Sequence, residues 1–238
     1  MMALVINLAK CYIVYLENAY NLGYGASLKK GLRVAKGKWI IITDADGTYP
    51  IDKIPELIKH TPKYDMVVGK RQTDNDHLGR CPAKYILKKI ASFVVGRNIP
   101  DLNSGLRVFR RDVAMEFYSL YPSGFSFTST ITLACMSSDY TVKYVDIPYY
   151  KRVGSSGIRP FHFFVFINLI IKMFLYFKPL RMLSPIAGIT LILGIARTLR
   201  DINAQGYIGS LAIIITFTAF FLFVLAFVTE VIIISKRN

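Results

Sequence analysis

The sequence of 238 residues predicts an α/β domain followed by a membrane-interface helix and two transmembrane helices. Strand-like and helix-like segments alternate up to about residue 160, which is typical of an α/β domain with a mainly parallel central sheet. Beyond that point apolar residues dominate, and two apolar segments are long enough to cross a bilayer. We therefore expect the α/β domain at 1–155, a basic loop and interfacial helix at 156–179, and a membrane hairpin at 180–238.

Short apolar runs rich in β-branched and aromatic residues mark the predicted strands. The run KWIIIT is continuously apolar after its lysine, as expected for a strand that is covered on both faces. The run LRVFRRD alternates instead between apolar and charged residues. In chain order the predicted strands are CYIVYL (11–16), KWIIIT (38–43), YDMVVG (64–69), LRVFRRD (106–112) and TVKYVDIPYY (141–150), the last interrupted by Pro148.

Helical spacing of apolar residues marks the segments between these strands. Over 23–37 the apolar residues recur at helical spacing, and Gly37 provides a stop signal. A second helix is expected near 51–60. A third is expected over 82–95, with Pro82 in its first turn, where proline is well tolerated.

The C-terminal third consists of three apolar segments. The first, 161–177, contains Lys172 near its centre, and a charge in the middle of a bilayer is costly. We expect this segment to lie in the headgroup plane, with a third span as the alternative. The segments 180–199 and 208–234 are predicted to span, because about 20 helical residues cross the ~30 Å hydrocarbon layer.

Basic residues flank the predicted hairpin more densely than they occupy its connecting loop, where Asp201 offsets part of the charge. This bias predicts a multi-pass protein with both ends of the hairpin, and hence the α/β domain, in the cytosol. In a prokaryote the membrane would be the plasma membrane. The flanking residues are Lys172, Lys178, Arg181, Lys236 and Arg237, and those of the loop are Arg197 and Arg200.

The composition points to anionic partners. Lysine and arginine number 30 against 15 acidic residues, so the formal net charge is +15, and 53% of the residues are hydrophobic. Phosphates, nucleic acid or anionic lipid would suit this balance. The basic residues are dispersed and no nucleic-acid recognition motif is present, so we do not expect nucleic-acid binding. Two spans with few intramembrane polar residues also disfavour a channel.

The stretch ITDADGTYP (42–50) places Asp44 and Asp46 directly after a predicted buried strand. Ligands bind at the carboxyl edge of the sheet in open α/β folds. Two carboxylates there suit Mg²⁺ or Mn²⁺, which completes its shell with substrate phosphates and water. The alternative is structural: an aspartate turn that caps the helix expected near Ile51.

Several motifs in order resemble family 2 glycosyltransferases of the GT-A fold, a Rossmann-like nucleotide-sugar domain. The order is N-x-G-x-G (from Asn21), a helix, GKWIIITDADGTYP, a helix, DMVVGKR and DLNSGLRVFRRD, then YYKRVGSSGIRP, YFKPLR and two membrane segments. It is most similar to the dolichyl- or polyprenyl-phosphate sugar synthases. The resemblance covers about 18–238, and the series is specific although each motif alone is not.

The resemblance implies particular roles on the donor side. Asp44 and Asp46 match the DxD motif that holds the metal and the nucleotide sugar, and Asp46 is also expected to be catalytic. Asp101, in DLNSG, matches the acidic residue beside the reacting centre. For Gly23 and Gly25 two interpretations stay open: close backbone approach to a donor phosphate, or loop geometry ahead of a helix.

On the acceptor side, the resemblance implies that basic residues hold a lipid phosphate. Arg71, in GKR, matches a residue near that phosphate, and Lys84 matches a similar one. Arg152 and Arg159 fall in the segment that leads onto the membrane helices. A polyprenyl phosphate is already anionic and needs no strong general base, so the residues mainly position two anions and screen their repulsion. The expected reaction moves a hexose from a UDP- or GDP-sugar to this lipid, with Mg²⁺ or Mn²⁺.

The sequence departs from the family at its N-terminus. The family begins with strands and a DDGS-type loop that hold the base and ribose, and this sequence starts near the helix that follows. We therefore expect a fragment or a degenerate relative that alone is weakly active or inactive. A non-catalytic membrane partner or scaffold is the alternative, which the retained DxD motif opposes. Oligomers occur among relatives, so a homo-oligomer is a further expectation.

Overall fold

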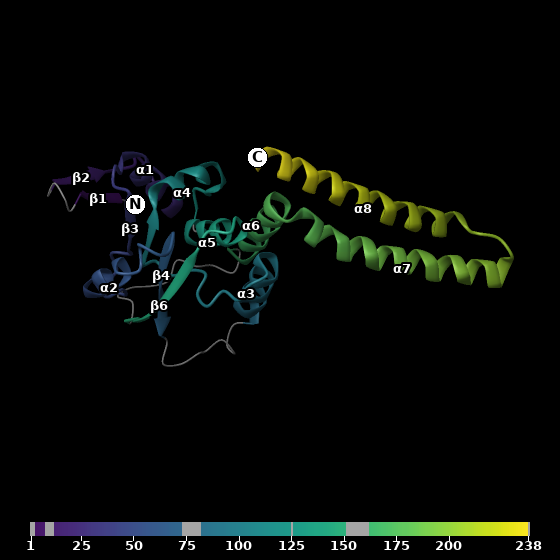
Figure 1. Cartoon of the computed structure of the whole chain (residues 1–238). Helices are drawn as coiled ribbons and strands as arrows, with labels where there is room; N and C mark the ends of the chain where they lie inside the picture. The colour runs from purple at the N-terminus through teal and green to yellow at the C-terminus, as the bar shows by residue number, and fades with distance from the viewer. Residues whose placement is uncertain (1–2, 8–11, 73–81, 125, 151–161, 238) are drawn as a thin grey trace. The chain divides into compact units, whose positions relative to one another are not determined.

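The structure is a computed structural model that describes residues 3–7, 12–72, 82–124, 126–150 and 162–237. The chain divides into two compact units, Met1–Ile170 and Ile171–Asn238, and each is considered by itself. The division falls inside 156–179, the segment predicted as a basic loop and interfacial helix. Figure 1 labels most of the helices and strands of both units.

Two sheets lie in the N-terminal unit. Strands β1 and β2 pair as an antiparallel hairpin. The larger sheet has the order β3-β5-β4-β6, in which β5 is antiparallel to both of its neighbours and β4 is parallel to β6. The bounds are Ala3–Asn7 (β1), Tyr12–Leu16 (β2), Trp39–Ile42 (β3), Met66–Gln72 (β4), Arg107–Arg110 (β5) and Val142–Pro148 (β6).

The expectation of a mainly parallel sheet is wrong for the described strands, because two of the three pairings in the larger sheet are antiparallel. An apolar or alternating run shows that a segment is a strand but carries no information about its direction. The chain that leaves β4 returns to the same edge of the sheet before β5 begins. Strand β5 must therefore run opposite to β4.

The three predicted helices of this unit are present, but α4 and α5 were not expected. Helix α4 begins at Arg111, inside the segment 106–112 that was predicted as a strand. All eleven residues of α5 are buried. A helix without a solvent-facing side has no amphipathic period to detect, and its sequence FTSTITLACMS is rich in poor helix formers. The bounds are Tyr24–Val34 (α1), Ile51–Lys53 (η1), Ile54–Ile58 (α2), Pro82–Val95 (α3), Arg111–Glu116 (α4), Tyr118–Leu120 (η3) and Phe127–Ser137 (α5).

The core forms on both faces of the larger sheet. On one face, Leu57 of α2 belongs to the same buried cluster as Val67 and Val108. On the other face, Arg107 of β5 reaches α5 through a hydrogen bond to the Thr128 carbonyl. Because side chains alternate along a strand, the single strand β5 contributes to both halves of the core.

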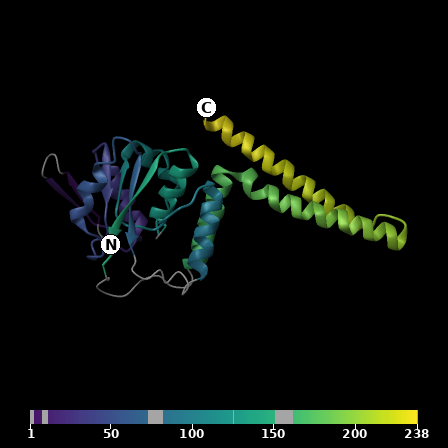
Figure 2. The ribbon, with the colours of Figure 1, turned by 60° about the horizontal axis from the view of Figure 1, so that its bottom comes forward.

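The C-terminal unit contains two long apolar helices, α7 (Pro179–Gln205) and α8 (Ser210–Arg237), which lie side by side in both views (Figures 1 and 2). Pro179–Gln205 and Ser210–Ser235 are long and apolar enough to cross a membrane. This agrees with the two predicted spans. Helix α6 (His162–Phe177) precedes them, and its placement in the headgroup plane stays a prediction.

Small buried residues line the contact between α7 and α8. Along each helix they recur every seven residues, the period of left-handed coiled-coil packing. A Cβ added at Gly194 would lie 2.6 Å from Thr216 Oγ1, so the backbones approach closely there. The repeating positions are Ala187, Gly194 and Asp201 on α7, and Ala212, Ala219 and Ala226 on α8.

Candidate functional site

One edge of the larger sheet collects four of the predicted site residues, Asp44, Asp46, Arg71 and Asp101. Strand β5 is antiparallel to β3 and β4, so its first residue lies at the edge where those two strands end. The chain after β3 carries Asp44, the end of β4 carries Arg71, and the loop before β5 carries Asp101. The direction of β5 therefore brings together residues that are far apart in the sequence.

Arg71 and Asp101 form a bidentate ion pair at this edge. Arg71 Nε donates to Asp101 Oδ2 and Nη2 donates to Oδ1, both at 2.8 Å. The carboxylate also accepts the backbone N–H groups of Arg71 and Asn103. The Asp101 side chain is 9% exposed and that of Arg71 28% exposed, so both charges are largely removed from water. The sequence assigned a role to each residue but did not predict that they pair.

The two partners shift each other's ionisation. Burial alone would raise the pKa of Asp101, but the hydrogen bonds and positive charge of Arg71 outweigh it and hold that pKa below its usual value. The pKa of Arg71 is raised, because its bonds to Asp101 and that carboxylate's charge outweigh the opposing effect of burial. Asp101 is therefore a carboxylate at neutral pH and not a proton donor.

The Asp44 carboxylate is held between α1 and the loop before β5. The hydroxyl of Tyr24 donates to Asp44 Oδ1 at 3.0 Å. Burial, and secondly the charge of Asp44, raises the pKa of Tyr24, so this hydroxyl keeps its proton. On its other side, Asp44 Oδ2 lies 2.3 Å from the place where a Cβ on Gly105 would stand. Sequence analysis missed Tyr24 and Gly105 as supports of the acidic pair.

Asp46 is oriented by Thr48, two residues later. Asp46 Oδ1 accepts the Thr48 hydroxyl at 2.5 Å and the Thr48 backbone N–H at 3.2 Å. Thr48 is itself fully buried. Asp46 therefore forms a local aspartate turn beside the strand end. It does not cap the following helix, as the structural alternative expected, because the N-cap of η1 is Pro50 without a side-chain hydrogen bond.

The donor set suits a hard divalent cation that takes most of its ligands from the substrate. Two carboxylates with oxygen-rich surroundings fit Mg²⁺ or Mn²⁺, whereas a cation held by protein alone needs more ligands. The described residues contain no group of three or more His, Cys, Asp or Glu side chains placed to hold a metal. Asp44 and Asp46 would thus be the protein ligands of the cation, and substrate oxygens and water would supply the others.

Replacing Gly105 with Ala is expected to disturb Asp44 selectively. The new Cβ meets the end of a movable side chain, not backbone, so the carboxylate should swing away while the fold is retained. We expect less than about 1 kcal/mol change in unfolding free energy, but at least tenfold weaker Mn²⁺-dependent binding of UDP by calorimetry. The control is Gly124→Ala, because a Cβ at Gly124 meets nothing within 4 Å. Unchanged Mn²⁺–UDP binding in Gly105→Ala would show that Asp44 does not hold the metal.

Two tyrosines, Tyr49 and Tyr149, pack between Gly105, which contacts Asp44, and Arg71, which pairs with Asp101. The Gly105 N–H donates to the Tyr49 hydroxyl at 2.7 Å, and the Tyr49 ring packs edge-on against Tyr149 with centroids 5.3 Å apart. The guanidinium of Arg71 lies 5.3 Å from the Tyr149 ring centroid. The Tyr149 ring therefore restricts Arg71 in addition to its bonds with Asp101. Tyr149 directly follows β6, and the residue pattern of that strand did not indicate its contact with Arg71.

Arg107 holds the loop that carries Asp101 and Gly105 through a hydrogen bond to the Ser104 carbonyl. Its side chain is fully buried, and its guanidinium donates to the Ser104 carbonyl, to the Thr128 carbonyl and to Thr132 Oγ1. Burial lowers its pKa. The sequence pattern showed Arg107 only as a charged residue in an alternating strand and did not predict its burial.

Gly23 and Gly25 approach protein backbone closely. A Cβ on Gly25 would lie 2.1 Å from the Pro122 carbonyl oxygen, and one on Gly23 2.6 Å from that of Ser123. The N–H of Gly25 donates to the Gly124 carbonyl at 2.9 Å. These contacts favour loop geometry over phosphate approach, the two interpretations that the sequence left open.

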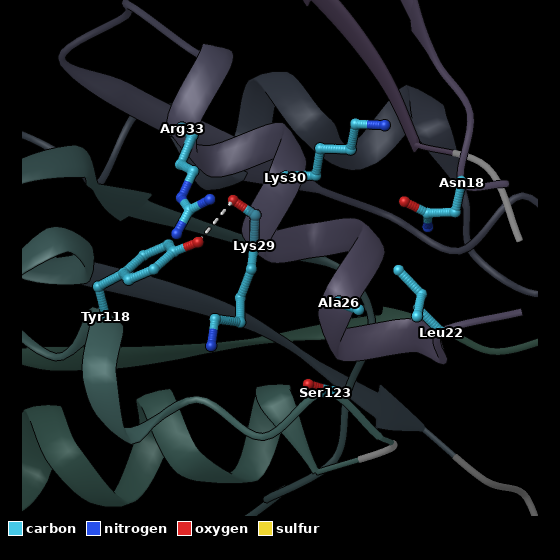
Figure 3. A pocket seen from close by; sticks show the side chains of 8 residues that line it. All are labelled: Asn18, Leu22, Ala26, Lys29, Lys30, Arg33, Tyr118 and Ser123. Carbon is cyan, nitrogen blue, oxygen red and sulfur yellow. Dashed lines mark hydrogen bonds between the residues drawn. The ribbon is translucent and has the colours of Figure 1, made fainter. Parts of the chain in front are cut away.

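The side-chain placement of the remaining predicted residues is not described. Lys84 belongs to α3, but its side chain is outside the described part of the structure, as are Arg152 and Arg159. A described cavity of about 400 Å³ lies beside α1 (Figure 3). Neither the acidic pair nor Asp101 nor Arg71 lines it.

Comparison with known proteins finds similarity to sugar transferases. Residues 6–117 match the family described as glycosyl transferase family 2. The chain is 28% identical over 144 residues to a dolichyl-phosphate hexose transferase of Haloferax volcanii, a match covering 58% of this chain and 62% of the relative. It is 26% identical over 177 residues to an undecaprenyl-phosphate 4-deoxy-4-formamido-L-arabinose transferase of Photorhabdus laumondii, covering 73% and 53%. The chain thus spans less than two thirds of these relatives.

One similar solved structure is glucosyl-3-phosphoglycerate synthase from Mycobacterium tuberculosis, in complex with Mn²⁺, uridine diphosphate and glucosyl-3-phosphoglycerate. The TM-score is 0.47 at 16% identity, and the match covers 64% of this chain and 54% of the synthase.

Proposed function

Because the chain carries a glycosyltransferase family 2 domain over residues 6–117, we propose that it transfers a hexose from a nucleotide-diphosphate sugar to a polyprenyl phosphate at the membrane. Relatives named for transfer to dolichyl and undecaprenyl phosphate support this acceptor class. The observation that carries the proposal is the sheet edge at which Asp44 and the Arg71–Asp101 pair converge. The same chain also carries two long apolar helices.

On the donor side, Asp44 and Asp46 are the residues that would hold Mg²⁺ or Mn²⁺. A divalent cation bound there would neutralise the charge that builds on the diphosphate leaving group. Tyr24 and Gly105 fix the direction of one carboxylate, and Thr48 fixes that of the other. Such fixed orientation is valuable because the ligands then need no rearrangement during the reaction.

On the acceptor side, Arg71 lies at the same sheet edge as Asp101 and Asp44. Asp101 uses its Nε and Nη2, and no hydrogen bond from Nη1 to another described residue accompanies them. We assign Nη1 to the acceptor phosphate. Asp101 holds the guanidinium plane in place, and as a carboxylate it also limits how strongly Arg71 attracts the anion. Because the acceptor oxygen is already anionic, this arrangement supplies position and charge without a general base.

The same proposal includes the membrane arrangement. The two apolar helices anchor the domain, and the basic residues that flank them favour the cytosolic face. Lys84, Arg152 and Arg159 are proposed as further contacts to the lipid phosphate. Association into homo-oligomers stays a prediction.

Replacing Asp44 with Asn tests the function directly. Membranes carrying the chain are incubated with labelled UDP- or GDP-hexose and polyprenyl phosphate, and the lipid extract is counted with Mn²⁺ or with EDTA. We expect Mn²⁺-dependent transfer to fall about a hundredfold, because a lost charge-stabilising group costs roughly 10²–10³ in rate. The isosteric change keeps the shape and removes the charge.

The matched control is Asp52→Asn, which removes an exposed carboxylate from the neighbouring turn. It should transfer like the unaltered chain. Equal transfer by Asp44→Asn and the unaltered chain would contradict the assigned role. No transfer by the unaltered chain above empty membranes would favour the non-catalytic alternative.

A further inference from the structure

The cavity beside α1 combines cationic, aromatic and uncharged polar groups away from the sheet edge (Figure 3). Its volume of about 400 Å³ is within the usual range for small-molecule sites. One face of α1 supplies most of the lining, because residues three, four and seven apart lie on the same side of a helix. The lining residues are Asn18, Leu22, Ala26, Lys29, Lys30, Arg33, Tyr118 and Ser123.

Two cations of this cavity share one aromatic ring. Lys29 Nζ and the guanidinium carbon of Arg33 each lie 5.0 Å from the Tyr118 ring centroid, and Figure 3 shows both side chains on the Tyr118 side of α1. The two charges are therefore at most about 10 Å apart, close to one Debye length at physiological ionic strength. The ring holds them in place although they repel each other.

Carboxylates do not neutralise these charges within the described residues. The nitrogen of Lys29 donates to the Tyr121 carbonyl at 3.1 Å, and that of Lys30 donates to the backbone carbonyl of Glu17. None of Lys29, Lys30 and Arg33 forms an ion pair with a described acidic side chain. A bound anion would relieve the repulsion that the protein leaves uncompensated here.

The lining of the cavity is uneven in its charge. Lys29 and Arg33 gather on the Tyr118 ring, whereas Lys30 extends toward the Glu17 carbonyl, next to Asn18. Leu22, Ala26 and Ser123 add uncharged lining. A phosphate group carries nearly two negative charges and several acceptor oxygens, so it suits clustered cations better than a single carboxylate does. We propose that this cavity is a second anion site, which binds the phosphate group of a small organic phosphate separately from the proposed donor site.

The test is calorimetric titration of the full chain in phosphatidylcholine nanodiscs with inorganic phosphate and with glycerol 3-phosphate. EDTA is present throughout, so that phosphate bound through a metal at the acidic pair does not contribute. Lys29→Gln/Arg33→Gln should lower the affinity for both ligands at least fivefold. Arg33→Gln alone spares the Lys29 hydrogen bond and should still weaken them at least twofold, with an unchanged circular dichroism spectrum.

The matched control is Lys36→Gln/Lys38→Gln, which removes two exposed charges that do not line the cavity. It should bind like the unaltered chain. Nanodiscs with one third phosphatidylglycerol distinguish the source of the phosphate: competition by this lipid assigns the site to a headgroup, and no competition assigns it to a soluble phosphate. Equal affinity in the unaltered chain and Lys29→Gln/Arg33→Gln, or equal losses in the control, would overturn the proposal. Because the site lies away from Asp44, the result is independent of the transfer assay.

Discussion

Replacing Asp101 with Ala is expected to lower the free energy of unfolding of the N-terminal unit by about 3 kcal/mol, near the lower end of the cost of breaking a buried ion pair. The lower end applies because the Arg71 side chain keeps 28% exposure and regains some water. The change also removes the two hydrogen bonds that the carboxylate accepts from backbone N–H groups. Urea unfolding of the full chain in detergent measures it, with the single tryptophan, Trp39 of β3, as the fluorescent reporter.

A double-mutant cycle separates the pair from its surroundings. Arg71→Met removes the cation, and Asp101→Ala/Arg71→Met should be less destabilised than the sum of the single changes by about 2 kcal/mol. The matched control is the neighbouring ion pair between Lys70 of β4 and Asp146 of β6, with side chains 42% and 53% exposed. Asp146→Ala should cost less than about 1 kcal/mol. Additive effects of the two changes would contradict the importance of the bidentate contact.

The contribution of Asp101 should also depend on pH in a defined direction. Its pKa is lowered in the folded protein, so the unfolded chain binds the proton more readily. The stabilisation is present above the ordinary aspartate pKa near 4 and is lost as the pH falls through the lower folded value. The difference between the unaltered chain and Asp101→Ala should thus be full at pH 7 and should shrink below pH 4. A difference that grows on acidification would mean that Asp101 is protonated when folded.

The sequence predicts the position of the acidic pair well, and the physical reason is local. KWIIIT must be a strand because it is apolar throughout its centre, and the residues after a strand necessarily lie at the sheet edge. The Arg71–Asp101 pair could not be predicted in this way. Thirty residues separate the partners, and their contact depends on β5 running antiparallel to β4. Strand direction is set by the path of the whole chain and not by any local pattern.

The supports of the site were missed for a related reason. Tyr24 and Gly105 act through contacts with Asp44 that only the folded chain creates. Arg107 is charged yet fully buried, against the usual preference of arginine for the surface, because carbonyl oxygens and a threonine hydroxyl replace its water. A pattern of apolar and charged residues assigns such an arginine to solvent. Buried polar residues are therefore where sequence and structure differ most in this chain.

Replacing Gly25 with Ala is expected to destabilise the N-terminal unit by about 3 kcal/mol, the upper part of the usual cost of overpacking. The new Cβ would lie 2.1 Å from the Pro122 carbonyl oxygen and 2.7 Å from that of Gly124. Both atoms belong to backbone, so no side-chain rotation relieves the clash. The loop must move away, and the hydrogen bonds from Gly25 and Ala26 to its carbonyls then lengthen. Urea unfolding followed by Trp39 fluorescence measures the loss.

Gly124→Ala provides the comparison within the same loop, because its Cβ would meet nothing within 4 Å. It should change the unfolding free energy by less than about 0.5 kcal/mol. The experiment also decides between the two roles of the N-terminal glycines. If Gly25 served mainly to admit a donor phosphate, Gly25→Ala would weaken Mn²⁺–UDP binding with stability unchanged. A large loss of stability instead identifies Gly25 as the residue that lets α1 pack against the loop before α5, and so holds Tyr24 where its hydroxyl reaches Asp44.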